Sequence, residues 1–220
     1  MEKLIAKAFP TLIGYFRRPE SELVNRDLRE LILDRERSTP SQPRANAGGW
    51  HSAADAMDWP SPAIHTLRNW IGEAMRDMID STMEMMAASG MPRQFRGSVQ
   101  LHAWANIARQ GNYHRVHNHP GCCWSGVYYV DAGHPAPDQP LSGVLDLIDP
   151  RPFTEMVTTP GEPYGQKLIV RPEAGLMVLF PSWLYHFVNP YMGEGERISI
   201  AFNIKVTEGT VDNPPRKQAM

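Results

Sequence analysis

The change from helical to strand periodicity after Gly97 constrains the fold of this chain more than any other feature of its sequence. Over residues 99–107, small or apolar side chains alternate with larger polar or aromatic ones, so each set faces one side of a strand. Further short strands are predicted between glycines and prolines, over residues 125–130, 143–148, 166–171, 176–180, 185–188 and 197–206. Many short strands separated by turn signals predict a sandwich or a jelly roll.

The N-terminal half carries the helical pattern. An amphipathic helix is predicted over residues 19–37, with acidic residues in its first turn and arginines toward its end. A second helix begins with Ser61 as its N-cap and Pro62 in its first turn, and it stops near Ser89. We expect both helices to pack on one sheet, which makes the fold mainly β (α+β) with the helices segregated to the N-terminal half.

The remaining segments complete one predicted domain over residues 1–220, because a 42% hydrophobic chain of 220 residues can bury one sizeable core. Residues 4–16 suit a short strand or an extended leading segment, and residues 38–49 suit a loop that is either a lid or a plain connector. The expected parts are a helical and loop extension (1–95), a jelly-roll core (96–207) and a C-terminal tail (208–220).

Composition limits the partners and the compartment. The net charge of -2 gives no electrostatic reason to expect nucleic acid or an anionic membrane, and no apolar run is long enough to span a bilayer. The only two cysteines, Cys122 and Cys123, are neighbours, which rarely pair, so we expect a reduced, cytoplasmic protein. A small-molecule or peptidyl ligand is the favoured partner, and the sequence does not indicate an oligomeric state.

Three histidines lie close together between two predicted strands. His117 and His119 are two residues apart, so in an extended strand both imidazoles face one side and can bind one metal ion. His114 has the opposite parity in a regular strand and is expected to lie outside the metal shell. Two histidines on a strand are also common as plain polar surface, so the pair alone leaves both interpretations open.

A third candidate ligand, His186, follows a turn and a buried strand, although a histidine among aromatic residues can also be a core residue. The last predicted strand places Arg197 and Ser199 on one face, either in water or in the interior of the jelly roll. Inside, the guanidinium and the hydroxyl would form a good clamp for a carboxylate.

The order His117-x-His119, His186, Arg197-x-Ser199 resembles the Fe(II)- and 2-oxoglutarate-dependent oxygenases, or 2OG-Fe(II) oxygenases. It is most similar to a bacterial group of unassigned substrate, and the resemblance covers residues 99–205. The more distant prolyl hydroxylases share further motifs, which read here Pro172-x-x-Gly175, Phe180-x-Ser182, His186-x-Val188-x-Pro190 and Ser125-Gly-Val-Tyr-Tyr-Val. The resemblance implies a double-stranded β-helix (jelly-roll) core.

Residue by residue, the resemblance implies that His117 and His186 are metal ligands and that Arg197 pairs with the distal carboxylate of 2-oxoglutarate. Tyr129 and Asn106 occupy the positions of two further contacts to the cosubstrate, with packing alone as the alternative. Three more side chains are expected to line the pocket, those of His102, Tyr113 and Trp124. No role is assigned to the remaining histidines, His51, His65 and His134.

One position departs from the family pattern. The usual triad has two histidines and one carboxylate, but the second motif position here is His119. Three neutral ligands leave the ion with its full double charge, which should strengthen binding of dianionic 2-oxoglutarate. An acid such as Asp146 entering the shell is the alternative.

The resulting prediction is an oxygenase, a hydroxylase by reaction, in which His117, His119 and His186 hold Fe(II). 2-Oxoglutarate and O2 would take the open positions, and oxidative decarboxylation to succinate and CO2 would drive oxidation of a bound substrate. A zinc-dependent hydrolase or lyase is one alternative, and a cupin-like protein that binds metal and an organic acid without turnover is another. Substrate choice is expected to depend on residues 38–59, 132–141 and 154–164.

Overall fold

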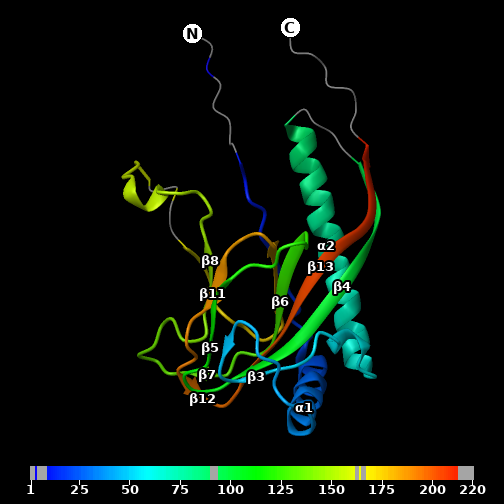
Figure 1. Ribbon diagram of the computed structural model, residues 1–220, viewed down its shortest axis with the longest axis vertical. Helices are drawn as coiled ribbons and strands as arrows, with labels where there is room; N and C mark the ends of the chain where they lie inside the picture. The colour runs from blue at the N-terminus through cyan, green and yellow to red at the C-terminus, as the bar shows by residue number, and fades with distance from the viewer. Residues whose placement is uncertain (1–2, 4–8, 90–93, 162–163, 165–166, 213–220) are drawn as a thin grey trace.

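The computed structural model describes residues 3, 9–89, 94–161, 164 and 167–212. These residues form two large antiparallel sheets that face each other, a third sheet of two strands, and two long helices (Figure 1). The helices are α1 (Glu22–Ser38) and α2 (Pro62–Ala88), with short 3-10 turns η1 (Ala56–Asp58) and η2 (Thr154–Met156). The strands are β1 (Gly14–Arg17), β2 (Asn46–Ala47), β3 (Trp50–His51), β4 (Gln94–Ala108), β5 (Tyr113–His117), β6 (Trp124–Asp131), β7 (His134–Pro135), β8 (Leu145–Ile148), β9 (Lys167–Val170), β10 (Leu176–Pro181), β11 (His186–Val188), β12 (Gly193–Glu194) and β13 (Arg197–Asp212).

The larger sheet has the strand order β1-β10-β6-β13-β4-β3, and the smaller sheet has the order β2-β5-β11-β8-β9. Figure 1 shows α2 lying along β4 and β13, which pair with each other over nearly their whole length. These features confirm the predicted fold class, a mainly β jelly roll with helices packed on one sheet.

A first apolar core lies between the helices and the larger sheet. Each helix offers one apolar stripe, such as Leu28 and Ile32 of α1, and alternate residues of β4 and β13 offer the facing surface. Burial of each large side chain contributes on the order of 2 kcal/mol. The sheet residues of this core include Ala103, Ala105, Ile107, Ile198, Ile200, Phe202 and Ile204, the face predicted from the alternation.

A second, smaller core lies between the two sheets and includes Leu147, Val178 and Phe180. Because successive strand residues point to opposite faces, the partners of the first-core residues on β4 and β13 point toward this space. Trp104, Asn106, Arg197 and Ser199 therefore face the smaller sheet and line a cavity between the two layers.

Both helices are found where the sequence places them, with one shift. α2 begins as predicted, because the Ser61 side chain accepts a hydrogen bond of 3.2 Å from the backbone N–H of Ala63. α1 begins at Glu22 rather than at residue 19, because the chain first makes a turn in which the Ser21 N–H bonds to the Arg18 carbonyl at 3.2 Å.

Two predicted boundaries change. β13 continues to Asp212 in register with the start of β4, so the tail predicted from residue 208 begins inside a strand. The segment predicted as a helical and loop extension packing on the core also adds strands to both large sheets, since β1 and β3 join the larger sheet and β2 joins the smaller one. Of the extended segment predicted over residues 4–16, residues 4–8 lie outside the described ranges, and β1 begins at Gly14.

Cys122 and Cys123 are free thiols. Neither helix in the described part of the chain has the length and apolarity needed to cross a bilayer.

Candidate metal centre and cosubstrate cavity

His117 and His186 form the centre of the candidate site. They end β5 and begin β11, and they lie directly opposite each other in the antiparallel pairing of these strands. Opposite residues in such a pair point to the same face, and their ring centroids are 4.3 Å apart. The pairing of two strands distant in sequence thus places two imidazoles side by side.

His119 completes the cluster, although it does not lie on a strand as the sequence predicts. β5 ends at His117 because the chain turns at Pro120 and Gly121, and His119 lies in the segment between. The His119 N–H donates to the Ser182 carbonyl at 2.9 Å, which fixes this segment beside β10. One nitrogen from each of the three rings lies within 4.8 Å of the other two, close enough to hold one metal ion.

Hydrogen bonds orient two of the rings. Nδ1 of His117 lies 2.7 Å from the Arg115 carbonyl, and Nδ1 of His186 lies 2.9 Å from the Leu184 carbonyl. A carbonyl only accepts, so in the neutral rings Nδ1 carries the proton and the Nε2 lone pair is free. Such backbone contacts are the usual support of a metal-binding histidine.

Burial keeps the three imidazoles neutral. It lowers the pKa of His186 to about 3 and that of His119 to about 4, and it lowers the pKa of His117 as well. A neutral imidazole is the form that binds metal.

The alternative ligand Asp146 lies elsewhere. It is opposite Phe187 in the β8–β11 pairing, so it points to the face away from His186. Its carboxylate instead accepts hydrogen bonds from Lys167 Nζ at 3.4 Å and from Asn189 Nδ2 at 3.2 Å.

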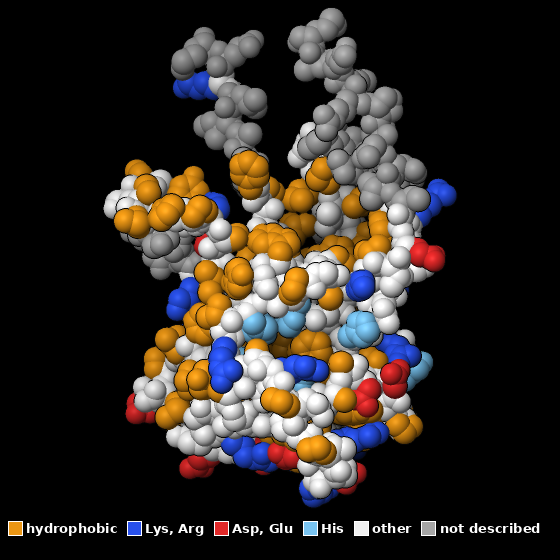
Figure 2. Space-filling view, in the orientation of Figure 1, with side chains coloured by type: hydrophobic (Ala, Val, Ile, Leu, Met, Phe, Trp, Pro, Cys, Tyr) orange, Lys and Arg blue, Asp and Glu red, His pale blue; other side chains and the backbone are white. Residues whose placement is uncertain are grey.

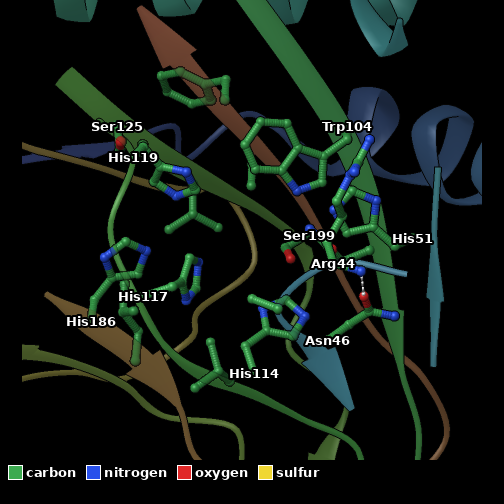
Figure 3. Close-up of a pocket in the computed structure, with 18 of the residues that line it drawn as sticks. Arg44, Asn46, His51, Trp104, His114, His117, His119, Ser125, His186 and Ser199 are labelled. Carbon is green, nitrogen blue, oxygen red and sulfur yellow. Dashed lines mark hydrogen bonds between the residues drawn. The ribbon is translucent and has the colours of Figure 1, made fainter. Parts of the chain in front are cut away.

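The histidine cluster opens into a cavity of about 540 Å³ between the sheets, a volume typical of small-ligand sites (Figure 3). None of the described side chains that line it carries a carboxylate. The polar and aromatic lining residues are Gln42, Arg44, Asn46, His51, Ser52, Trp104, Asn106, His114, His117, His119, Ser125, Tyr129, Phe180, His186, Arg197, Ser199 and Phe202.

Arg197 lies in this cavity with only 3% of its surface exposed. Its Nε donates to the Gly143 carbonyl at 3.0 Å, and its guanidinium carbon lies 5.1 Å from the centre of the Tyr129 ring. Gly143 has φ of +63°, and a Cβ there would approach Arg197 Cδ to 2.9 Å, so the turn requires glycine. Burial lowers the pKa of Arg197, and the described residues offer its guanidinium no acidic partner.

Two further polar atoms of the cavity are buried, the Tyr129 hydroxyl and Asn106 Oδ1, and neither makes a hydrogen bond with the described residues. The Tyr129 side chain interacts with the guanidinium of Arg197. Burial raises the pKa of Tyr129, so the hydroxyl keeps its proton and can donate. Unpaired buried polar groups are costly, and native proteins rarely keep them without a ligand or water. Together with the nearly buried Ser199 hydroxyl, the Tyr129 hydroxyl fits the carboxylate of a bound organic acid, whereas Asn106 Oδ1 is an acceptor and suits a donor.

His114 also lines the cavity, contrary to the parity argument. In the pairing of β5 with β11, His117 is opposite His186 but His114 is opposite Val188, so β5 carries a bulge between them. The bulge turns His114 to the same face as His117, with ring centroids 6.5 Å apart. Burial and the nearby charge of Arg197 lower the pKa of His114 to about 3. It remains outside the group of three that could hold a metal ion.

Other pocket assignments change as well. His102, Tyr113 and Trp124 were expected to line the pocket, but none of them does. His51 does line it and stacks on Trp104 with ring centroids 5.6 Å apart. The parity of β4, which places Trp104 on the face of Asn106, could have identified Trp104; no local signal identifies His51, because its position depends on the long-range pairing of β3 with β4.

Comparison with known proteins relates this architecture to one family. Residues 102–203 match the family described as putative 2OG-Fe(II) oxygenase. A prolyl-4-hydroxylase from Pseudomonas putida superposes with a TM-score of 0.59 at 15% identity, covering 88% of this chain and 91% of that chain. HygX from Streptomyces hygroscopicus, solved with nickel and 2-oxoglutarate, gives a TM-score of 0.59 at 12% identity over 90% of this chain and 83% of that one.

A prolyl hydroxylase from Trichoplax adhaerens, solved with a peptide fragment of a hypoxia inducible factor, gives a TM-score of 0.54 at 12% identity, covering 88% and 83% of the two chains. At identities of 12–15%, these similarities show that the chain shares the fold of the solved structures and nothing more. No curated protein matches the chain.

Proposed function

We propose that the chain is an oxygenase of the 2OG-Fe(II) family, whose model matches residues 102–203, and from this premise we assign roles to its residues. The family uses Fe(II), 2-oxoglutarate and O2. We assign the metal to His117, His119 and His186, and the cosubstrate to Arg197 with Ser199, Tyr129 and Asn106. The observation that carries this assignment is a cavity that holds three converging imidazoles and a buried arginine without an acidic partner.

The three imidazoles fit the metal by their chemistry. Neutral imidazole nitrogens bind Fe(II) well, and three of them on one side leave the other side of the ion for exogenous ligands. The backbone carbonyls behind His117 and His186 hold these rings in the required tautomer. When bound, Fe(II) supplies the redox chemistry that couples decarboxylation of 2-oxoglutarate to oxidation of the substrate.

Arg197 fits the distal carboxylate of 2-oxoglutarate. Its Nε is held by Gly143, so the terminal nitrogens are fixed in direction and can bind a carboxylate side-on. The Tyr129 hydroxyl donates a further hydrogen bond to the same anion, which gives this buried group the partner that it lacks in the protein alone. The roles of Asn106 and Ser199 are to orient the cosubstrate from the neighbouring strands.

His119 in place of an acid makes the metal site more positive. A carboxylate ligand would cancel one of the two charges of the ion, whereas three imidazoles cancel none. Dianionic 2-oxoglutarate therefore gains attraction in a cavity whose described lining residues include no acidic side chain.

Free thiols at Cys122 and Cys123 support a reducing compartment, and we propose the cytoplasm. The prolyl hydroxylase from Trichoplax adhaerens was solved with a peptide fragment, and HygX was also solved with hygromycin B, a small molecule. We propose a small-molecule or peptidyl substrate for this chain.

The test is turnover of the cosubstrate. Purified protein loaded with Fe(II) should convert 2-oxoglutarate to succinate in the presence of O2, and the His186→Ala variant should not. Retention of zinc on purification, with no succinate formed after exchange for Fe(II), would favour the zinc hydrolase alternative. Tight binding of Fe(II) and 2-oxoglutarate without any succinate would favour a cupin-like binding protein.

A further inference from the structure

This inference rests on the function proposed above. If the cavity binds only Fe(II) and 2-oxoglutarate, its positive charges exceed its negative charges. Arg197 and Arg44 each bring one positive charge, and a divalent ion on three neutral imidazoles brings two. 2-Oxoglutarate supplies two negative charges, and no acidic side chain lines the cavity within the described residues. Two positive charges therefore remain in the cavity and at its rim, where they attract an anion.

Arg44 is the charge that the proposed reaction leaves unused. Figure 3 shows Arg44, Asn46 and His51 on the side of the cavity opposite His117 and His186. The distal carboxylate of 2-oxoglutarate is already assigned to Arg197. The described residues offer the Arg44 side chain neither an ion pair nor a hydrogen bond.

The backbone around Arg44 is fixed although its side chain is exposed. The Arg44 N–H donates to Asn46 Oδ1 at 2.8 Å, and the carbonyl of Ala45 accepts from the Arg115 N–H at 2.9 Å. The pairing of β2 with β5 continues this attachment. The guanidinium is therefore presented from an anchored segment at the rim of the cavity, which lowers the entropy cost of binding a ligand.

The surroundings of Arg44 suit an organic anion with an apolar or aromatic body. His51 stacks on Trp104 at an interplanar angle of 12°, and the two rings form a flat wall beside the histidine cluster. Figure 2 shows histidine side chains at a hollow in the middle of one face of the molecule, with Lys or Arg side chains next to it.

We infer that the substrate of this oxygenase carries an anionic group, and that Arg44 is the specificity-determining residue that binds this group. A guanidinium binds a carboxylate or a phosphate by the same paired hydrogen bonds. The substrate would place its anionic end at Arg44 and the carbon to be oxidised toward the histidine cluster.

Binding under anaerobic conditions tests this inference without any turnover. Protein loaded with Fe(II) is first saturated with 2-oxoglutarate, and the visible charge-transfer band of the chelate is recorded. Two anionic probes, 3-phenylpropionate and phenyl phosphate, are then titrated against their neutral counterparts 3-phenylpropionamide and phenol, with the shift of the band and the heat of binding as readouts. Comparison of the two anions distinguishes carboxylate from phosphate recognition.

The expected result is tighter binding of at least one anion than of its neutral counterpart by about 10-fold or more. Arg44→Gln should abolish this preference and leave the affinity for 2-oxoglutarate within about threefold. Arg115→Gln is the matched control, because Arg115 lies on the neighbouring strand β5, is exposed and does not line the cavity; it should keep the preference.

Two results would overturn the inference while leaving the proposed function intact. One is a normal 2-oxoglutarate band together with equal affinity for each anion and its neutral counterpart, or with no binding of any probe. The other is an anion preference that Arg44→Gln retains. If the 2-oxoglutarate band did not form, the proposed function would be wrong, and the inference that rests on it would be wrong as well.

Discussion

His117 and His186 lie directly opposite each other on β5 and β11, with ring centroids 4.3 Å apart and each Nδ1 bonded to a backbone carbonyl of its own segment. The separation in sequence is large, but the antiparallel register makes the two rings neighbours. This relationship determines where a metal ion can bind, because both Nε2 lone pairs remain free for it.

Removal of one of these rings should remove the metal. His186→Ala is expected to weaken Fe(II) binding by at least about 100-fold, because loss of even a supporting group behind a ligand costs about 10- to 100-fold. His114→Ala is the matched control, since His114 lines the same cavity but lies outside the group of three. Equilibrium dialysis of both variants measures the difference, and equal losses would contradict the assignment of His186.

Replacement of Arg197 should affect the cosubstrate and spare the metal. Arg197→Ala is expected to weaken 2-oxoglutarate binding by about 10- to 100-fold, the usual value of hydrogen bonds to a charged group. Arg197→Lys keeps the charge but loses the side-on geometry, so an intermediate loss is expected. Calorimetric titration of the Fe(II)-loaded variants checks both, and unchanged affinity in Arg197→Ala would disprove the clamp.

Tyr129→Phe should have opposite effects on the free and the bound protein. Its buried hydroxyl has no partner in the protein alone, so its removal should stabilise the ligand-free protein by about 1 kcal/mol. The same change should weaken 2-oxoglutarate binding, because the phenylalanine ring offers the carboxylate no hydrogen-bond donor. Thermal unfolding with and without 2-oxoglutarate measures both effects. A variant that loses stability in both states would show that the ring serves packing alone.

The strand pattern alone predicted much of this architecture and placed Arg197 and Ser199 on one face of a strand, but it left open whether that face lies in water or in the interior. The shared face is predicted correctly because β13 pairs with β4 without a register shift from Arg197 to Val206, so parity keeps Arg197 and Ser199 on one side of the strand. Parity fails for His114, because a bulge depends on the pairing of β5 with β11, which no local pattern records.

His119 and His51 illustrate the same limit at longer range. His119 reaches the cluster from a turn, held by a hydrogen bond to Ser182, rather than from the predicted strand. His51 reaches the cavity because β3 pairs with β4, across the whole of α2 in sequence. Positions set by tertiary pairing require the structure, whereas positions set by parity do not.

His119→Asp should separate metal binding from cosubstrate binding. The variant restores a carboxylate to the triad, so it should still bind Fe(II), but the lower charge of the site should weaken 2-oxoglutarate binding by several-fold. Titrations of Fe(II) and then of 2-oxoglutarate measure the two affinities. Tighter 2-oxoglutarate binding in the variant would contradict the charge argument.

Tyr128 should control the stability of the protein in alkaline solution. Its ring is fully buried, its hydroxyl donates to Asn25 Oδ1 at 2.6 Å, and burial raises its pKa from 10.0 to about 12. The folded state therefore keeps this proton between pH 10 and 12 while the unfolded state loses it, so stability is full below pH 10 and falls as the pH rises through this window. Urea unfolding should show a shallower fall in Tyr128→Phe, and an identical slope would contradict the shift.

The most direct test of the central claim is a spectrum recorded without oxygen. Addition of 2-oxoglutarate to the Fe(II)-loaded protein should produce the visible metal-to-ligand charge-transfer band of a chelated 2-oxo acid. The band should be absent in His186→Ala and should require a higher 2-oxoglutarate concentration in Arg197→Ala. If the Fe(II)-loaded protein gave no band at saturating 2-oxoglutarate, the assignment of this cavity as an iron and 2-oxoglutarate site would be wrong.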